Sequence, residues 1–347
     1  MKALVYQGPK ELALIEREIP APGEGEVLLE VKACGICGSD IHGYLGITGR
    51  RLPGIAMGHE FSAVVTKLGK NVTNHHTGER VIVQPIDSCG HCFYCKEGNN
   101  NLCPDRKLMG VMEVQGAMAE YISVPEKLLV PMADSCSFER GALAEPFAVA
   151  YAAVNKVQDY SGKKVLVIGA GMIGICILEM LKLKRPAKIV VSDLSDARLK
   201  RAKQIGADEV INPKRQAFGR TVAKLTDGAL FDVSIEAVGV SAAANQSIQA
   251  LRKNGLSIWT GVSQHEITLD MHEVVTCQRT IAGSMNYTQE EFRETVRLLE
   301  SGRLDTDGLI TRRVALEQAA QLFDEIYENP DDYLKVMIVK ENSWIKR

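Results

Sequence analysis

Four cysteines lie close together in the first third of the chain, in the spacing C-x2-C-x2-C-x7-C. They are Cys89, Cys92, Cys95 and Cys103. Four thiolates complete the tetrahedral coordination of Zn²⁺ and leave no position for a reactant, so a site of this kind is structural. The spacing therefore predicts a structural zinc lobe at about residues 85–105.

Two other interpretations of these cysteines are a pair of disulfides and a zinc ribbon that binds nucleic acid. The chain has nine cysteines, an odd number, and Cys34, Cys136, Cys176 and Cys277 stand alone. The first residues read as a strand rather than a secretory signal, which favours reduced thiols in the cytoplasm. The 41 Lys and Arg residues against 43 Asp and Glu residues provide no basic surface for a nucleic acid.

A second set of metal-ligand residues precedes the cysteine cluster and is incomplete. Cys37 is followed by the adjacent pair His59 and Glu60. A catalytic zinc ion is held by three protein ligands and keeps a fourth position for water or substrate. The sequence therefore predicts two zinc ions per chain, one in a closed site and one in an open site.

Two kinds of element must position these residues. Before residue 146 the apolar runs are short and are separated by Pro and Gly, as in a mostly-β domain. From about Lys163 strands alternate with helices, which predicts right-handed crossovers and a parallel sheet. We expect the boundary between Pro146 and Gly162. The expected strands include 27–31, 61–65 and 80–83 in the first part, and 165–168, 189–191, 209–211, 231–235 and 256–259 in the second.

One apolar stretch, Val165 to Leu181, has almost the length of a membrane span. Three glycines interrupt it, and Glu179 and Lys182 stand near its end. A buried strand, turn and helix explain the stretch better than a membrane segment does. No membrane partner is predicted.

The three glycines form the pattern G-x-G-x-x-G directly after a strand. Gly169 permits a tight turn, Gly171 lets the backbone approach a pyrophosphate, and Gly174 lets the helix pack on the sheet. Met172 and Ile173 lie at the start of this helix, whose free N–H groups and positive dipole end favour phosphates. The pattern predicts a dinucleotide site.

Asp193 ends the next strand, where a carboxylate hydrogen-bonds the adenosine ribose and repels a 2′-phosphate. This favours NAD over NADP. The alternative is that Asp193 caps the following helix. Arg198 in that helix is a further candidate near the ribose, because a cation there would tolerate a 2′-phosphate; we interpret it as a solvated side chain.

Several motifs occur in one order, and with them the chain resembles the zinc-containing medium-chain dehydrogenase/reductase family, the alcohol dehydrogenases, over nearly its whole length. The motifs are residues 35–42 (GICGSDIH), 58–60 (GHE), the four-cysteine lobe, 145–146 (EP) and 169–174 (GAGMIG). The resemblance implies an α/β fold with a GroES-like, mostly-β catalytic domain at 1–150 and a Rossmann NAD-binding domain at 151–284. It also implies that segment 285–347 returns to the first domain, and that the protein is a homodimer or homotetramer.

The resemblance also implies roles at the open site. Cys37 and His59 match zinc ligands of the family, and Glu60 matches the third ligand of the branch that resembles sorbitol dehydrogenase. Glu145 stands where other alcohol dehydrogenases carry a cysteine ligand, so it either binds the metal or holds its water. Ser39 matches the position of a hydroxyl that contacts the substrate oxygen.

Four further residues receive a role from the resemblance. His42 matches the last group of a proton relay in some members, with a surface histidine as the alternative. Lys335 matches a basic residue at the cofactor pyrophosphate, with a solvated lysine as the alternative. Val238 and Val262 match backbone positions beside the nicotinamide.

The expected reaction is zinc-dependent oxidation of a secondary alcohol by hydride transfer to NAD. The carboxylate at the metal favours a polyol or sugar alcohol. Residues 285–287 (MNY) resemble a run in galactitol-1-phosphate dehydrogenases, and Arg50 and Arg51 would reach an anionic group or lie in solvent. A phosphorylated hexitol is thus the leading substrate. L-Threonine, 2,3-butanediol, L-iditol, sorbitol and a sugar acid such as L-galactonate stay open.

Two interpretations fall outside this reaction. The first is a zinc-lacking relative that reduces enones or quinones with NADPH, and the intact metal ligands and Asp193 disfavour it. The second is a non-catalytic relative that binds a nucleotide. Bound zinc without turnover of any polyol would favour the second interpretation.

Overall fold

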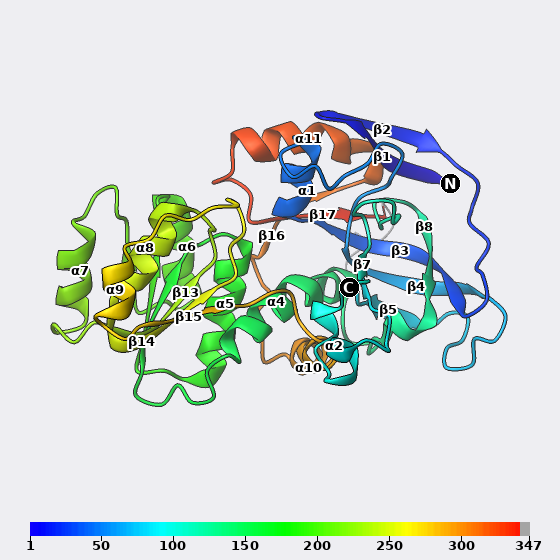
Figure 1. Cartoon of the computed structure of the whole chain (residues 1–347). Helices are drawn as coiled ribbons and strands as arrows, with labels where there is room; N and C mark the ends of the chain where they lie inside the picture. The colour runs from blue at the N-terminus through cyan, green and yellow to red at the C-terminus, as the bar shows by residue number, and fades with distance from the viewer. Residues whose placement is uncertain (341–347) are drawn as a thin grey trace. The chain divides into compact units, whose positions relative to one another are not determined.

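The computed structural model describes residues 1–340 and divides them into two compact units. The first unit consists of residues 1–145 together with the described chain from residue 288 onward, and the second unit of residues 146–287. In Figure 1 the two ends of the colour scale meet in the first unit, which shows that the two chain ends build one domain.

The first unit is built on a seven-stranded sheet in the order β16-β17-β3-β4-β5-β9, with β8 paired to β3. Strand β17 runs antiparallel to β3, with Val336 opposite Ile36 and Val339 opposite Ala33. The C-terminal segment is therefore part of the first sheet. The strands are β3 (Glu26–Ile36), β4 (Glu60–Leu68), β5 (Arg80–Val83), β8 (Tyr121–Pro125), β9 (Leu129–Pro131), β16 (Ile310–Val314) and β17 (Lys335–Val339).

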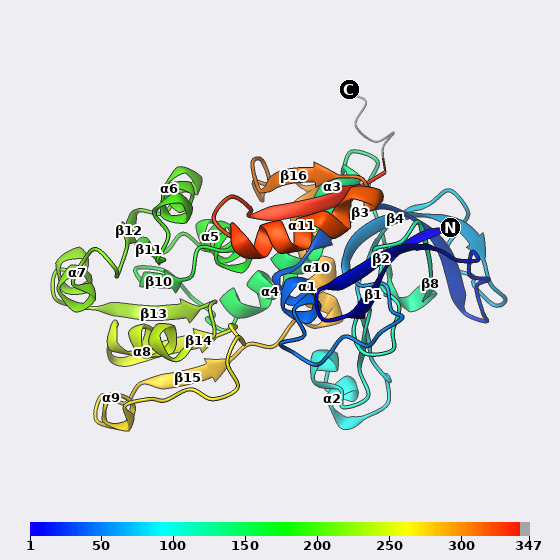
Figure 2. The same cartoon turned by 90° about the horizontal axis from the view of Figure 1, so that it is seen from above.

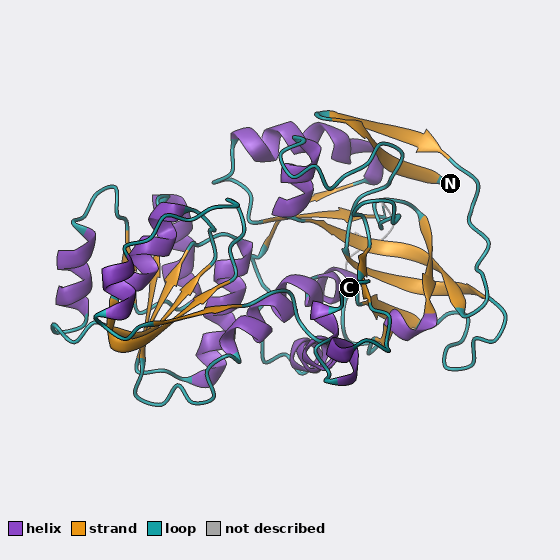
Figure 3. Ribbon diagram, viewed as in Figure 1, coloured by secondary structure: helices purple, strands orange, loops and turns teal. Residues whose placement is uncertain are grey.

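Shorter elements surround this sheet, and Figure 3 shows how much of the first unit is strand and loop. A hairpin of β1 (Lys2–Gly8) and β2 (Glu11–Glu16) and a pair of β6 (Ile86–Asp87) and β7 (Lys107–Leu108) form two small sheets. The helices of the unit are α1 (Gly38–Tyr44), α2 (Phe93–Lys96), α3 (Phe138–Ala142), α10 (Gln289–Glu300) and α11 (Leu316–Glu328), with 3₁₀ turns at Asn100–Leu102 and Glu126–Leu128.

Helix α1 is fixed by apolar packing, although it has only two turns. Its Tyr44 ring packs on Phe323 of α11, with the ring centroids 5.2 Å apart, and both rings are buried. An aromatic pair of this kind contributes about 0.5–1.5 kcal/mol beyond its buried area. Helix α11 therefore holds in place the helix that carries several residues of the candidate site.

The second unit contains a six-stranded sheet of parallel strands in the order β12-β11-β10-β13-β14-β15, which is the strand order of a Rossmann sheet. Figure 2 shows α5 and α6 on one side of this sheet and α8 on the other. The strands are β10 (Lys164–Ile168), β11 (Lys188–Ser192), β12 (Glu209–Ile211), β13 (Phe231–Glu236), β14 (Leu251–Trp259) and β15 (Thr280–Gly283). The helices are α4 (Ala144–Val154), which crosses the unit boundary, α5 (Met172–Lys184), α6 (Asp196–Ile205), α7 (Phe218–Leu225), α8 (Ser241–Gln249) and α9 (Met271–Val275).

The predicted alternation of strands and helices is confirmed, and with it the parallel sheet. The apolar stretch Val165–Leu181 forms β10, the glycine turn and most of α5. Among residues 1–340 no helix has the length and apolarity that crossing a membrane requires. The strands of this sheet are apolar along most of their length because helices cover both faces.

Candidate active site

The open ligand set is assembled where β3 ends and β4 begins. Cys37 follows β3 and is the N-cap of α1, while His59 precedes β4 and Glu60 opens it. The two strands are antiparallel neighbours, with Gly35 opposite Glu60. As a result, donor atoms of Cys37, His59 and Glu60 all lie within 4.8 Å of one another.

Gly35 makes room for this arrangement. A Cβ atom added to Gly35 would lie 2.2 Å from Oε2 of Glu60, so any other residue there would displace the Glu60 carboxylate. The glycine before the ligand loop therefore lets the Glu60 carboxylate fold back over β3 toward Cys37.

The environment of His59 favours a positive charge. Burial lowers the pKa of this imidazole, but the neighbouring Asp40, Cys37 and Glu145 raise it to about 10. Nδ1 of the buried His59 has no hydrogen-bond partner within bonding distance among the described residues. A thiolate, an imidazole and a carboxylate are the donor types that Zn²⁺ prefers, so the site fits a zinc ion.

Glu145 lies in the first turn of α4 and is largely buried. It lies near enough to His59 to act on that ring electrostatically, but it is outside the group of three whose donor atoms lie within 4.8 Å. The geometry therefore favours Glu60 as the third ligand and Glu145 as a neighbouring carboxylate.

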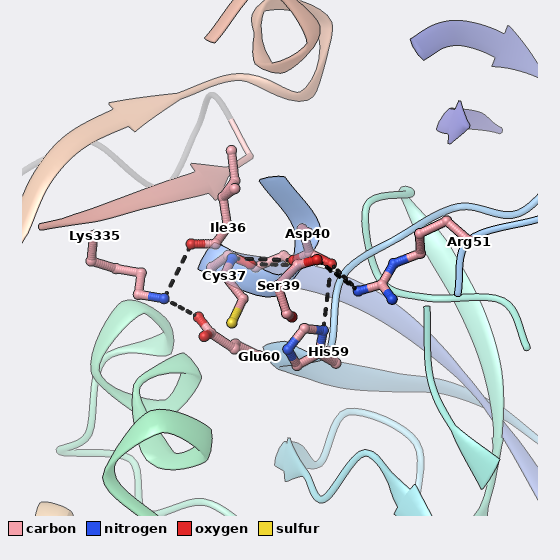
Figure 4. A network of polar contacts seen from close by, with 10 residues as sticks. Ile36, Cys37, Ser39, Asp40, Arg51, His59, Glu60 and Lys335 are labelled. Atoms are coloured by element: carbon pink, nitrogen blue, oxygen red, sulfur yellow. Dashed lines mark hydrogen bonds and ion pairs between the residues drawn. The ribbon is translucent and has the colours of Figure 1, made fainter. Parts of the chain in front are cut away.

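Lys335 lies directly beside Glu60. Its Nζ donates to Oε2 of Glu60 at 2.5 Å and to the carbonyl oxygen of Ile36 at 3.1 Å (Figure 4). Only 2% of Lys335 and 1% of Glu60 is exposed. From the sequence Lys335 was expected at the cofactor pyrophosphate or in solvent. In the structure its ammonium group instead forms a buried ion pair with the candidate ligand Glu60.

Replacing Lys335 with methionine is expected to lower the free energy of unfolding by about 3–5 kcal/mol, because one partner of a buried ion pair would remain uncompensated. The exposed pair of Lys2 and Glu317 supplies a control, and Lys2→Met should cost about 1 kcal/mol or less. Denaturant unfolding of both variants measures the difference. Equal stability of the two variants would contradict the assigned ion pair.

Ser39 and His42 lie on α1, three residues apart, and are therefore neighbours on one face of the helix. Both residues are exposed. Figure 4 shows Ser39 next to Cys37 and His59. A hydroxyl beside the ligand set, followed by an imidazole on the same face, is an arrangement that can carry a proton to solvent.

Asp40 received no role from the sequence, and Arg51 was expected at an anionic group of the substrate or in solvent. Asp40 is fully buried, and its Oδ2 accepts the N–H of Cys37 at 3.1 Å. Its Oδ1 lies 3.0 Å from Nη2 of Arg51 and 3.6 Å from Nδ1 of His59. The position three residues after a helix N-cap is a signal that could have indicated Asp40. Arg51 has no such local signal, and its burial excludes solvent as its environment.

The four-cysteine cluster is also assembled. The four Sγ atoms lie within 4.8 Å of one another, and those of Cys89 and Cys95 are 3.9 Å apart. Backbone N–H groups of His91 and Cys92 favour the thiolate and help lower the pKa of Cys89 to about 6. All nine cysteines are free, as the preference for metal over disulfides requires. Four thiol groups facing one centre fit a structural zinc ion.

The glycine turn in the second unit has the geometry of a phosphate-binding turn. Gly169 has a φ of +98°, and a Cβ on Gly174 would lie 1.8 Å from the carbonyl oxygen of Gly169. A Cβ on Gly171, the N-cap of α5, would meet nothing within 4 Å, so the backbone there is open to a ligand. Met172 and Ile173 form the first turn of α5, where N–H groups lack intrahelical acceptors.

Asp193 connects this turn to the end of β11. Its Oδ2 accepts the N–H of Ala170 at 2.7 Å and its Oδ1 accepts the N–H of Ser195 at 2.9 Å. The cap of α6 is Ser195, whose Oγ accepts the N–H of Arg198. The alternative in which Asp193 caps this helix is therefore wrong, and its carboxylate lies beside the glycine turn.

Val238 and Val262 follow β13 and β14, neighbours in the parallel sheet. The loops are joined because Oγ of Ser263 donates to the carbonyl oxygen of Val238 at 2.6 Å. The Val262 side chain is 82% exposed, so its contribution to a ligand site would come from its backbone. Both residues lie at the carboxyl edge of the sheet with Gly169, where such sheets bind ligands.

Comparison with known proteins assigns the family. Residues 23–134 match the alcohol dehydrogenase GroES-like domain, and residues 173–301 match the zinc-binding dehydrogenase domain. The chain is 32% identical to sorbitol dehydrogenase of Bacillus subtilis, with 97% of each chain covered. It is also 32% identical to L-galactonate-5-dehydrogenase of Escherichia coli, with 97% of this chain and 98% of the relative covered.

Solved structures agree. An Escherichia coli alcohol dehydrogenase complexed with NADH superposes with a TM-score of 0.92 at 30% identity, covering 98% of this chain and 99% of the other. Galactitol-1-phosphate dehydrogenase of Escherichia coli superposes with a TM-score of 0.91 at 26% identity, covering 98% and 100%. The expected fold class is thus confirmed in both units. The chain belongs to the zinc-type medium-chain alcohol dehydrogenase family, as a zinc-dependent NAD(P)-linked dehydrogenase that acts on the CH–OH group of a secondary alcohol or polyol.

Proposed function

We propose that this dehydrogenase oxidises a secondary alcohol of a polyol or sugar alcohol and uses NAD as the acceptor. The observation that carries the proposal is the donor set of Cys37, His59 and Glu60, with the Glu145 carboxylate close by. A site with one thiolate and two carboxylates is polar and suits a substrate with several hydroxyl groups. Relatives named for sorbitol and for L-galactonate support this class of substrate.

In this proposal Cys37, His59 and Glu60 would hold the zinc ion, which would supply a Lewis acid for the substrate hydroxyl. Ser39 would accept the hydroxyl proton as it gives its own proton toward His42 on the same helix face, and His42 would release a proton to solvent. Glu145 accepts a hydrogen bond from the substrate or from water. NAD supplies the hydride acceptor and is oriented by the glycine turn and by Asp193.

The preference for NAD rests on the Asp193 carboxylate. Replacing Asp193 with alanine should remove the repulsion of a 2′-phosphate and the hydrogen bonds to the ribose. One such charge-assisted contact contributes about 1.5–3 kcal/mol, so kcat/KM for NAD relative to NADP should fall about 10- to 100-fold. The exposed Glu209 in the same unit is the control, and Glu209→Ala should leave the ratio unchanged. An unchanged ratio in Asp193→Ala would contradict the assignment.

Within this class we propose a phosphorylated hexitol as the leading substrate. Relatives named for a phosphorylated polyol support it: D-arabitol-phosphate dehydrogenase of Enterococcus avium is 32% identical over 97% of each chain, and the galactitol-1-phosphate dehydrogenase superposes closely. Arg51 is buried against Asp40, so Arg50, which is exposed, is the member of the arginine pair that remains for a phosphate. Residues 285–287 resemble a run in galactitol-1-phosphate dehydrogenases. Of these, Tyr287 is fully buried and Met285 is 37% exposed, so Met285 is the more accessible of the two.

The experiment that tests the proposal measures NADH formation by the two-zinc protein on matched substrates. The panel contains galactitol, sorbitol, their phosphates, 2,3-butanediol, L-threonine and L-galactonate. We expect the highest kcat/KM for a hexitol phosphate, and Arg50→Met should raise KM for the phosphate alone. A preference for an uncharged polyol would overturn the phosphate assignment and keep the polyol class. No turnover of any polyol would contradict the proposed function.

A further inference from the structure

We propose that Arg51 is a positioning residue for the open metal site: it holds Asp40, and Asp40 in turn orients Cys37 and His59. The inference rests on the proposed placement of zinc at these ligands. It concerns how the site is held in shape, so its test reads metal binding as well as turnover.

The contact between Arg51 and Asp40 is a buried ion pair. Nη2 of Arg51 lies 3.0 Å from Oδ1 of Asp40, and the two side chains are 4% and 0% exposed. The same nitrogen lies 3.5 Å from the carbonyl oxygen of Ser39, in the first turn of α1. Figure 4 shows Arg51 reaching Asp40 from one side while Cys37 and His59 lie on the other. The guanidinium thus contacts Oδ1 of Asp40, the same carboxylate oxygen that lies near Nδ1 of His59.

Asp40 contacts both ligands. Its Oδ2 accepts the backbone N–H of Cys37 at 3.1 Å, which sets where α1 begins and where the thiol stands. Its Oδ1 lies 3.6 Å from Nδ1 of His59, a buried nitrogen without a hydrogen-bond partner among the described residues. A metal-binding histidine usually donates its second ring N–H to a carboxylate, which fixes the tautomer and the ring orientation. Asp40 is the carboxylate in place for Nδ1, and this leaves Nε2 for the metal.

The distribution of charges gives Arg51 a second effect. Arg51 is the counter-ion of Asp40, and Lys335 is the counter-ion of Glu60. Asp40 and Glu60 thus each have a buried cation as a partner. Loss of Arg51 would leave the Asp40 carboxylate without a counter-ion in a low-dielectric region. Because a buried, unpaired charge is costly, we expect the Asp40 side chain to move or to pair with another group.

The absence of a side chain at Gly43 leaves the space that the Arg51 side chain occupies. Gly43 is buried in α1, and a Cβ atom there would lie 2.5 Å from Cγ of Arg51 and 3.1 Å from its Nε. The Arg51 side chain therefore passes over α1 at Gly43, the position at which the helix has no side chain. The backbone is fixed as well, because the N–H of Met112 donates to the carbonyl oxygen of Arg50 at 3.0 Å. Gly43 thus leaves room for the Arg51 side chain, and the loop before Arg51 is tied to the backbone of Met112.

The first test compares Arg51→Met with Arg313→Met. Arg313 forms an ion pair with Glu139 in the same unit and contacts neither zinc site, so it controls for the loss of an arginine. Competition with a chromogenic chelator measures the affinity of each of the two zinc ions. We expect the open-site affinity to fall about 10- to 100-fold in Arg51→Met, the usual effect of removing a residue that supports a ligand. The four-cysteine site and the Arg313→Met protein should be unchanged.

A spectroscopic readout separates positioning from plain stability. With Co²⁺ at the open site, the visible bands report ligand geometry, and they should shift in Arg51→Met but not in Arg313→Met. Arg51→Lys keeps the charge with fewer donors and should restore part of the zinc affinity. Unchanged bands and unchanged affinity in Arg51→Met would overturn the proposal.

Substitution of Gly43 tests the proposal in a protein that still contains Arg51. Gly43→Ala should weaken open-site zinc by displacing Arg51, and the same change in an Arg51→Ala background should have no further effect. An equal loss in both backgrounds would overturn the proposal, because the glycine would then act without the arginine. Gly43→Ala keeps Arg51, so its zinc affinity can be measured even where the Arg51 variants fail to fold, and an unchanged open-site affinity in Gly43→Ala would then overturn the proposal. If the zinc effects appear and no polyol is turned over, the proposed function fails while the positioning role stands.

Discussion

Cys37→Ala is expected to abolish polyol oxidation while one zinc ion per chain remains bound. The thiolate of Cys37 is one of three donors at the open site, and two donors do not hold zinc tightly. Loss of the Lewis acid removes several kcal/mol of transition-state stabilisation, so kcat should fall by about 10³-fold or more. Initial rates and metal analysis on one preparation measure both quantities.

Cys277→Ala is the matched control for this experiment. Cys277 is a single, partly buried cysteine of the second unit, outside both ligand sets, and its replacement should leave two zinc ions and full activity. Full activity of Cys37→Ala would show that the thiol is not a zinc ligand, and the proposed mechanism would be wrong.

Cys95→Ser should have its main effect on folding. The four-cysteine lobe is built from a short helix, a 3₁₀ turn and loops, and three of its four cysteines are only partly buried. Its stability must therefore come largely from the metal, and structural zinc contributes about 10–16 kcal/mol in zinc-finger peptides. Loss of even part of this energy should lower the first thermal transition by more than about 10 °C.

Thermal unfolding and zinc content of Cys95→Ser and Cys277→Ser measure this effect. The molecules of Cys95→Ser that stay folded should keep the open-site zinc and turn over substrate. An unchanged transition temperature would mean that the lobe folds without its metal, and the structural assignment would fail. The two cysteine variants thus separate the roles of the two metals, one by activity and one by stability.

The local pattern of the sequence was sufficient to predict strands and helices of the second unit. The expected strand 165–168 is β10 (Lys164–Ile168), and the helix expected after Asp193 is α6 (Asp196–Ile205) behind its cap, Ser195. Strands covered by helices on both faces are apolar along their length, and a capped helix carries its own start signal. The ligand types were equally readable, because Cys37 directly follows β3, and His59 and Glu60 lie at the start of β4, the next strand in the chain.

Contacts between residues far apart in the sequence were not predictable in this way. Lys335 reads as a basic residue before an apolar strand, which suggests solvent or a phosphate. In the structure β17 pairs with β3 so that Val336 faces Ile36, and this register brings Lys335 to the end of β3, where the ligand loop begins. Lys335 is buried because β17, near the end of the chain, pairs with β3, near its beginning. The residues around Lys335 in the sequence do not indicate this pairing.

Arg51 shows the same limit. Two adjacent arginines in a loop suggest a solvated or anion-binding surface, and Arg50 does lie exposed. Arg51 instead passes over Gly43 to a fully buried carboxylate. Which of two neighbouring cations is buried depends on a helix that lies beside the loop only in the folded protein.

The most direct test of the account follows zinc and turnover together. Chelator is added stepwise to the two-zinc protein, and zinc per chain and NADH formation on the best polyol are measured at each step. The account predicts that activity disappears with the first zinc released, from Cys37, His59 and Glu60, and returns when one equivalent is added back. Undiminished oxidation after that zinc has left would contradict the central claim that this site performs the reaction.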